Sequence, residues 1–244
     1  MLGRPQSPAC DLVLADPTLF DSYRATYIND MNGVGFNTGT PIARALLNVG
    51  YSFTSSEDIY RNVFGFGSGY SYPIAYRNDV LTSENRSWCW GDQNTAIIII
   101  SDGEPSGDGL TSTVVTKLRQ FNAGPVYCPD WAPCGSGTLS GRDKGTNPAV
   151  YTDDNPNYML DDVAKLLAQQ DLQRADPPVV GNFDTSGQQS LRIHTIGYGH
   201  ASNLLRNTAV VGNGLYFTAW DPETLRSALR GILCASGVKT QVCP

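Results

Sequence analysis

Four consecutive isoleucines constrain this chain more than any other feature of its sequence. Residues 95–101 read TAIIIIS and are followed by Asp102 and Gly103. A short, unbroken β-branched run is typical of a strand buried on both faces, as in the centre of a parallel sheet covered by helices. Ligands of open α/β sheets collect beyond the carboxyl ends of the strands, where Asp102 stands in a tight turn that Gly103 allows. The alternative is that Asp-Gly is simply a turn dipeptide.

Length and composition indicate a large folded α/β domain with insertions. The chain has 244 residues, of which 41% are hydrophobic and 16% charged. Its net charge of -6 argues against nucleic acid as the main partner, because such binding rests on clusters of Lys and Arg. No segment approaches the roughly 20 apolar residues of a membrane span, and the N-terminus lacks a signal-peptide core. We therefore expect either a cytosolic protein or a mature or trimmed piece of a secreted one.

The cysteines favour the secreted alternative. Two pairs bracket short loops that suit local disulfides in an oxidising compartment, although spacing leaves the pairing open. The chain has no two-residue CxxC spacing, and both histidines lie far from the cysteine pairs in sequence, which disfavours zinc. The six residues are Cys10, Cys89, Cys128, Cys134, Cys234 and Cys243.

Helical and strand-like segments alternate along the chain, which predicts an open, mostly parallel sheet with helices on both faces. Asp221 and Pro222 predict a capped start for the last helix, and Thr40 with Pro41 predicts another. We expect long insertions at about 51–93 and 122–156. The predicted helices are 18–31, 42–53, 110–121, 158–172, 202–211 and 222–233, and the further strands are 190–199 and 215–220.

Five polar residues receive structural interpretations. Asp161 and Asp162 fall on the polar side of an amphipathic helix and are expected to face water. Asp153 and Asp154 precede an Asn-Pro turn, with the same expectation. His194 alternates with apolar strand positions and is predicted to be a hydrogen-bonded structural histidine rather than a catalytic one.

Four segments in order resemble a von Willebrand factor A domain over residues 37–233, with 1–36 as an N-terminal flank and 234–244 as a tail. In that family a GTP-type helix opening and a strand-terminal (S/T)DG turn belong to a metal-ion-dependent adhesion site. The resemblance therefore implies that Thr40 and Asp102 are metal-site residues for Mg²⁺, Mn²⁺ or Ca²⁺. The four segments are GTPIARAL, AIIIISDGEP, LRIHTIGYG and GLYFTAWDPETLRSALRGI.

More narrowly, the chain resembles the N-terminal domain of the PilY (PilC) family of type IV pilus biogenesis factors and tip adhesins. The likeness is carried by DDVAKLLAQQDL before a TIGYG strand, by the SDGEP turn with Gly107 and Asp108 nearby, by Cys89 and by YFTA. It implies a non-enzymatic adhesion or assembly module, secreted or periplasmic and exposed at the pilus tip. Its partners would be proteins, such as minor pilins or host and matrix proteins.

The chain departs from the family in one element, the DxSxS loop after the first strand. The nearest candidate begins at Asp16 but has Phe20 where the second hydroxyl is needed. The simplest account is that this domain lacks the family's first strand. Thr40 and Asp102 alone leave a divalent ion with one carboxylate, so a metal-free structural A domain is the alternative.

A hydrolase is the third possibility, since Asp102, Asp108 and the paired aspartates could supply acid/base or metal chemistry. A Ser-His-Asp enzyme would need an activated serine, and the chain has no GxSxG elbow. Residues 65–71 are glycine-rich but lack the Lys-Ser/Thr of a phosphate-binding loop.

Overall fold

The computed structural model describes the sheet, most of its helices and the junctions between them. The described residues divide into two compact units: those from 48–93 and 171–189 belong to one, and those from 39–47, 94–170 and 190–244 belong to the other. The described residues are 39–51, 53, 88, 93–103, 105–110, 112, 114, 115, 118, 158–172, 179, 180, 183, 184 and 186–236.

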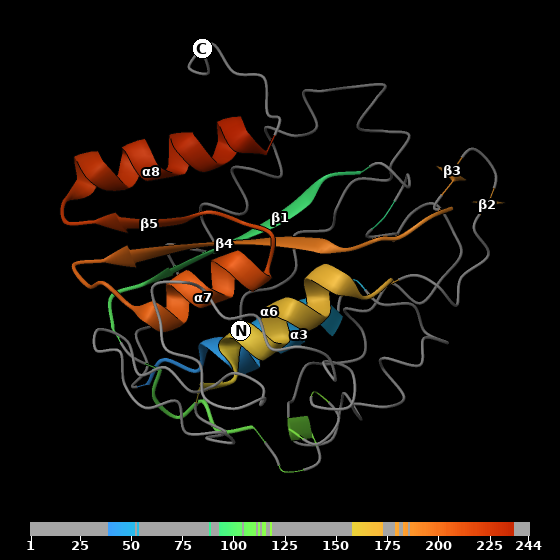
Figure 1. The fold of residues 1–244 in the computed structure, drawn as a ribbon, viewed down its shortest axis with the longest axis horizontal. Helices are drawn as coiled ribbons and strands as arrows, with labels where there is room; N and C mark the ends of the chain where they lie inside the picture. Colours follow the sequence, from blue (N-terminus) through green and yellow to red (C-terminus); the bar gives the residue numbers. More distant parts are fainter. Residues whose placement is uncertain are drawn as a thin grey trace, which may run out of the picture. The chain divides into compact units, whose positions relative to one another are not determined.

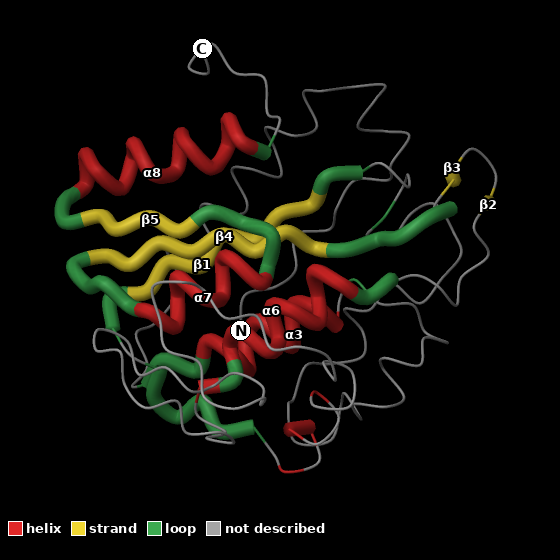
Figure 2. The backbone as a smooth tube through the Cα atoms, in the orientation of Figure 1, coloured by secondary structure: helices red, strands yellow, loops and turns green. Residues whose placement is uncertain are grey.

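The larger unit is built on a three-stranded parallel sheet with the order β1-β4-β5. Strand β1 (Thr95–Ser101) pairs along its whole length with β4 (Leu191–Tyr198), with Ile98 opposite His194. Strand β5 (Tyr216–Ala219) pairs with the second half of β4. The α/β class predicted from the alternation of helical and strand-like segments is confirmed (Figures 1 and 2).

Helices cover both faces of this sheet (Figure 1). Helix α8 (Pro222–Ala235) packs on β5 and β4 on one side, while α6 (Leu160–Gln169) and α7 (Asn203–Val211) pack together on the other. Helix α3 (Ile42–Tyr51) precedes β1 in sequence. Under α8 the core consists of Ile196, Ala219, Ala228 and Ile232, with Ile98 and Phe217 packed against them.

Local sequence signals set where these helices begin. The Asp221 carboxylate accepts hydrogen bonds from the N–H groups of Glu223 and Thr224. The Thr224 hydroxyl accepts the Asp221 N–H in return, which completes a capping box at the start of α8. The Ser202 hydroxyl accepts the Leu205 N–H at the start of α7. Both caps satisfy amide groups that have no partner inside the helix, as the residue types predict.

Strand β4, and not β1, is the buried centre of the described sheet. Its residues from Ile193 to Gly197 are all buried, whereas Ile97, Ile98 and Ile99 of β1 are only partly buried and Ile100 is 48% exposed. The expectation that the isoleucine strand is buried on both faces is therefore wrong. Among the described strands, β1 has one neighbour and lies at an edge.

The prediction that Asp161 and Asp162 face water is also wrong. Both residues are 1% exposed in the first turn of α6. The Asn207 side-chain amide of α7 donates a very short hydrogen bond to Asp161, and the Asp162 N–H donates to the other Asp161 oxygen at 3.1 Å. Helix α7 packs on α6 and supplies the amide that binds Asp161, on a side of the helix that periodicity alone assigned to solvent.

The smaller unit contains an aromatic contact and a hairpin within its described residues. Trp88 is buried, stacks edge-on against Phe53 at 5.6 Å between ring centroids, and donates its indole N–H to the Phe53 carbonyl at 3.1 Å. Strands β2 (Val179–Val180) and β3 (Phe183–Asp184) pair antiparallel.

Several sequence predictions lie outside the described residues. These are the helix at 18–31, the loop 122–156 with Asp153 and Asp154, the DxSxS candidate at Asp16, and five of the six cysteines. The described cysteine, Cys234, is disulfide-bonded, and its partner lies outside the described part of the chain. Within the predicted helix at 110–121, the described residues Ser112, Val114, Val115 and Leu118 are helical, whereas Leu110 is not.

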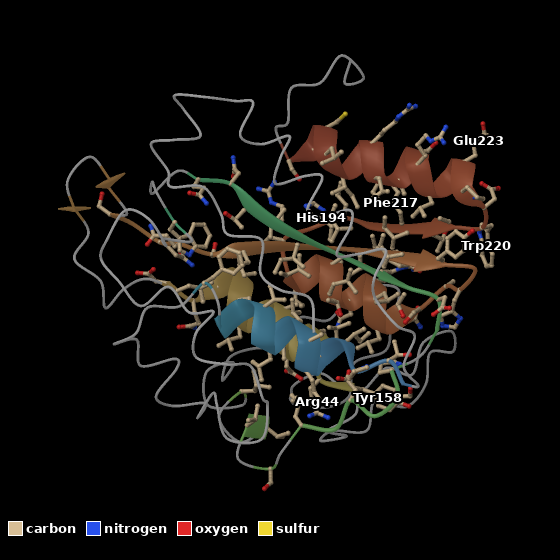
Figure 3. The ribbon with its side chains drawn as sticks, turned by 180° about the vertical axis from the view of Figure 1, so that it is seen from behind. Arg44, Tyr158, His194, Phe217, Trp220 and Glu223 are labelled. Atoms are coloured by element: carbon tan, nitrogen blue, oxygen red, sulfur yellow. The ribbon has the colours of Figure 1, made fainter. Side chains whose placement is uncertain are left out.

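His194 is a structural histidine, as predicted from its place in the strand (Figure 3). The Leu215 N–H donates to its Nδ1 at 3.0 Å, and the Ser236 hydroxyl lies 3.3 Å from its Nε2. The ring therefore connects β4 to the start of β5 and to the end of α8. Burial lowers the pKa of His194 below 6.5, and the positive charge of Arg192 lowers it further.

We predict that His194 destabilises the fold as the pH falls. Because its folded pKa is depressed, its neutral form contributes stability above pH 6.5, and that contribution is lost as the pH falls through the folded value. Urea unfolding at pH 7.5 and 5.5 should show a smaller loss of stability for His194→Asn than for the wild type. His200→Asn is the matched control and should behave as the wild type; equal losses in all three proteins would contradict the prediction.

Candidate functional site

The two predicted site residues lie on two segments that a backbone bridge joins. Thr40 pairs with Ser106 in an isolated antiparallel bridge, and Ser106 lies in the loop that begins at Asp102. The Thr40 N–H donates to both the carbonyl and the hydroxyl oxygen of Ser106 at 2.9 Å, and the Ser106 N–H returns a bond to the Thr40 carbonyl at 3.2 Å. The segment before α3 is thereby fixed to the loop after β1. We call residues 39–44, 101–103 and 105–108 the β1–α3 junction.

Thr40 and Asp102 offer side-chain oxygens that the junction itself does not use. Asp102 is exposed, next to a turn in which the Ser101 hydroxyl accepts the Gly103 N–H and donates to the Gly103 carbonyl. Thr40 is partly buried, and its recorded hydrogen bonds are made by its backbone. Among the described residues, neither the Thr40 hydroxyl nor the Asp102 carboxylate has a hydrogen bond or ion pair.

Asp108, and not Thr40, caps helix α3. The two Asp108 carboxylate oxygens accept the N–H groups of Ala43 and Arg44 at 2.9 and 3.0 Å. The Pro41 carbonyl accepts the first helical bond, from Ala45, so the helix begins at Ile42 and Thr40 lies outside it. The expected Thr40 cap is therefore replaced by a carboxylate that comes from 65 residues further along the chain.

Asp108 is a buried charge at a helix N-terminus, and its burial governs its titration. The side chain is fully buried. Burial raises the pKa of Asp108 from 3.8 to about 6, although hydrogen bonds from Arg44 and Ala43 and the charge of Arg44 oppose the rise. The positive end of α3 and the two amide donors make this the position in the junction where a buried carboxylate is best accommodated.

Glycines on either side of the bridge make this packing possible. Gly39 adopts φ 108° and Gly107 adopts φ 64°, both in the region that L-residues rarely occupy. A Cβ on Gly39 would lie 3.4 Å from the Ser106 carbonyl. Gly103 has no positive φ, and a Cβ there would meet nothing within 4 Å, so the expectation that its turn depends on glycine is wrong.

The side-chain oxygens of Thr40 and Asp102 are the type of ligand that a hard divalent cation prefers, but they are too few to fill its coordination shell. Mg²⁺ and Ca²⁺ prefer six or more oxygen ligands, and the Thr40 hydroxyl and Asp102 carboxylate are oxygens. Asp108 is committed to α3, and the described residues contain no cluster of three or more acidic, His or Cys side chains that could hold a metal ion. Thr40 and Asp102 therefore form part of a coordination shell at most.

The carboxyl ends of the other two strands carry different chemistry. His200 follows β4, and Trp220 follows β5 with 63% of its surface exposed. Trp220 lies beside the start of α8, near Glu223 (Figure 3). Because parallel strands end at the same edge of a sheet, this edge presents a carboxylate, an imidazole and an indole, which are side chains suited to contacts with another protein.

No protein-family model, curated protein or solved structure matches the chain. The resemblance to the A domain therefore remains a prediction from sequence motifs. None of the helices in the described part of the chain has the length and apolar composition needed to cross a membrane.

We predict that Asp108 makes the fold less stable as the pH rises from 4 to 7. Between the unfolded pKa of 3.8 and the folded value of about 6, the folded protein retains a proton that the unfolded chain has lost. The stability of the wild type relative to Asp108→Asn should therefore fall by about 3 kcal/mol across this range in urea titrations. Asp108→Ala should lower stability by about 1–3 kcal/mol for each amide left without a partner.

Asp221→Asn is the matched control, because Asp221 also caps a helix but is exposed. Hydrogen bonds from the Thr224 backbone and side chain lower the pKa of Asp221. Its contribution is therefore present above the unfolded pKa and lost as the pH falls, which is the opposite direction. A pH-independent difference between the wild type and Asp108→Asn would contradict the prediction.

Proposed function

We propose that this chain is a non-enzymatic protein-binding module of the von Willebrand factor A type, acting in adhesion or assembly of a type IV pilus. Its contact surface in this proposal is the carboxyl edge of the sheet around the β1–α3 junction. The observation that carries the proposal is that Thr40 is bridged to Ser106, four positions after Asp102, and that the side-chain oxygens of Thr40 and Asp102 have no partner among the described residues.

A divalent cation gives this arrangement a means of recognition. In the proposal Mg²⁺, Mn²⁺ or Ca²⁺ is held by Thr40, Asp102 and water, and an acidic group of the partner completes the shell. The incomplete donor set supports this division of ligands, because two protein ligands alone give low affinity. The cation then binds the isolated chain weakly, so that a high cation concentration is needed, and binds more tightly once the partner's acidic group completes the shell.

In this proposal the protein acts outside the cytoplasm. Cys234 is disulfide-bonded, which supports an oxidising compartment such as the periplasm or the cell surface. Partners there would be minor pilins or host and matrix proteins. The acidic net charge of -6 supports a protein partner over nucleic acid.

One observation favours a metal-free structural module as the second candidate. The buried carboxylate of the junction, Asp108, caps α3. The described residues contain no cluster of three or more His, Cys, Asp or Glu side chains that could hold a metal ion. In that case the A-type domain serves as a scaffold in pilus or envelope assembly, and Asp102 is a turn residue.

Thermal unfolding with and without divalent cations separates the two candidates. A ligand that binds the native state stabilises it, by about 1.4 kcal/mol at ten times its Kd, which is a few degrees in Tm for a chain of this size. We expect at least one of Mg²⁺, Mn²⁺ and Ca²⁺ to raise the Tm of the wild type, and Asp102→Ala and Thr40→Val to reduce or abolish this rise.

Glu223→Gln is the control for charge, because Glu223 is an exposed carboxylate on the same sheet edge but outside the junction. It should retain the full effect of the cation. If none of the three ions raises the Tm, the metal-assisted proposal is wrong and the metal-free structural module is favoured. A rise that persists in Asp102→Ala would place the cation elsewhere.

A further inference from the structure

The Ser106 side chain lies directly across the backbone bridge from Thr40. The two residues are partners in the antiparallel bridge and exchange both of its backbone hydrogen bonds, at 2.9 and 3.2 Å. Residues that face each other in an antiparallel pair carry their side chains on the same side, with Cβ atoms about 4.5–5.5 Å apart. The hydroxyl groups of Thr40 and Ser106 therefore leave the bridge on one side.

Contacts in the junction hold Ser106 in this position. Its Oγ accepts the Thr40 N–H at 2.9 Å, and two residues later Asp108 binds the amide groups at the start of α3. Ser106 is nevertheless exposed. A Cβ on Gly39 would lie 3.7 Å from the Ser106 Oγ, so glycine at that position leaves this side of the hydroxyl uncovered. An accessible oxygen that is already positioned needs little reorganisation to bind a ligand.

Ser101 is the other serine of the junction, and its hydroxyl is committed to its own turn. It donates to the Gly103 carbonyl at 3.0 Å and accepts the Gly103 N–H at 3.4 Å, and Ser101 is 4% exposed. A hydroxyl oxygen has two lone pairs. Among the described contacts Ser106 uses one of them, for the Thr40 N–H, so the second can bind a cation.

We propose that the Ser106 hydroxyl is a third protein ligand of the divalent cation, together with Thr40 and Asp102. This inference rests on the proposed function, in which the cation has two protein ligands and water. Two oxygen ligands of one Mg²⁺ or Ca²⁺ lie roughly 3 Å apart, since metal–oxygen distances are about 2.0–2.6 Å. Hydroxyl groups on the same side of one bridge can reach that separation by rotation about χ1.

Thermal unfolding over a series of Mg²⁺ and Ca²⁺ concentrations tests the role of Ser106. Ser106→Ala removes the hydroxyl but keeps the bridge, because main-chain atoms make both of its hydrogen bonds. The apparent Kd of the cation, taken from the concentration dependence of Tm, should rise by about tenfold or more, as when a residue that supports a metal ligand is lost. Ser106→Thr keeps the hydroxyl and should bind the cation as the wild type does.

Ser227→Ala is the matched control, because Ser227 is an exposed serine of α8 outside the junction. Its hydroxyl also takes part in one hydrogen bond of this kind, to the Glu223 carbonyl at 3.0 Å. The variant should leave the apparent Kd unchanged. The Tm rise of every variant is measured against its own Tm without cation, which separates a loss of stability from a loss of binding.

Exchange of the ligand atom separates direct coordination from positioning of Thr40. A thiolate prefers soft metal ions to Mg²⁺, so Ser106→Cys should lose the Mg²⁺ effect and be stabilised by Cd²⁺ more than the wild type is. Ser227→Cys carries its thiol outside the junction and should respond to Cd²⁺ as the wild type does. Both cysteine variants are used with the native disulfides intact, which a titration showing one additional free thiol confirms.

The outcomes distinguish this inference from the proposed function. A cation effect that Asp102→Ala abolishes and Ser106→Ala leaves unchanged would overturn the role of Ser106 and retain the proposed function. Equal responses of Ser106→Cys and the wild type to Cd²⁺ would also show that Ser106 is not a ligand. Absence of any cation effect in the wild type would overturn both. An effect lost in Ser106→Ala but kept in Asp102→Ala would support Ser106 and remove Asp102 from the site.

Discussion

The Asp108 carboxylate fixes the geometry of the candidate site. It satisfies two amide groups at the start of α3 from the loop that follows β1. Helix α3 contributes no acidic residue in its own first turn, so its N-terminus depends on this external cap. The bridge between Thr40 and Ser106 adds a second set of hydrogen bonds beside it. Together these contacts fix the backbone before α3 to the loop after β1.

The elements of the sheet could be predicted from the sequence because their signals are local. The isoleucine run, the alternation at 191–198 and the Asp221-Pro222 opening each lie within one segment and were sufficient to locate β1, β4 and α8. The Asp108 cap could not be predicted in this way, because it joins residues 65 positions apart. The missing acidic residue in the first turn of α3 was the available signal for an external cap.

Burial was predicted less well than secondary structure, and for a related physical reason. Periodicity identifies the apolar face of α6, but it cannot show that α7 also covers the opposite side and buries Asp161. Similarly, an isoleucine strand has the composition of a central strand whether or not it has two neighbours. Burial depends on which elements are assembled around a segment, and that information is not local.

Four aspartates near helix starts or strand ends show how one residue type divides between structure and function. Asp161 and Asp108 are buried and bonded, and Asp221 is exposed but bonded to its own helix. Each is therefore committed to holding an element in place. Asp102 is exposed, lies at the end of a strand whose position is fixed by β4, and has no partner among the described residues. A carboxylate with unused hydrogen-bonding capacity among the described residues can bind a cation or a partner without the fold losing one of its described contacts, and this is why Asp102 remains the strongest candidate for recognition.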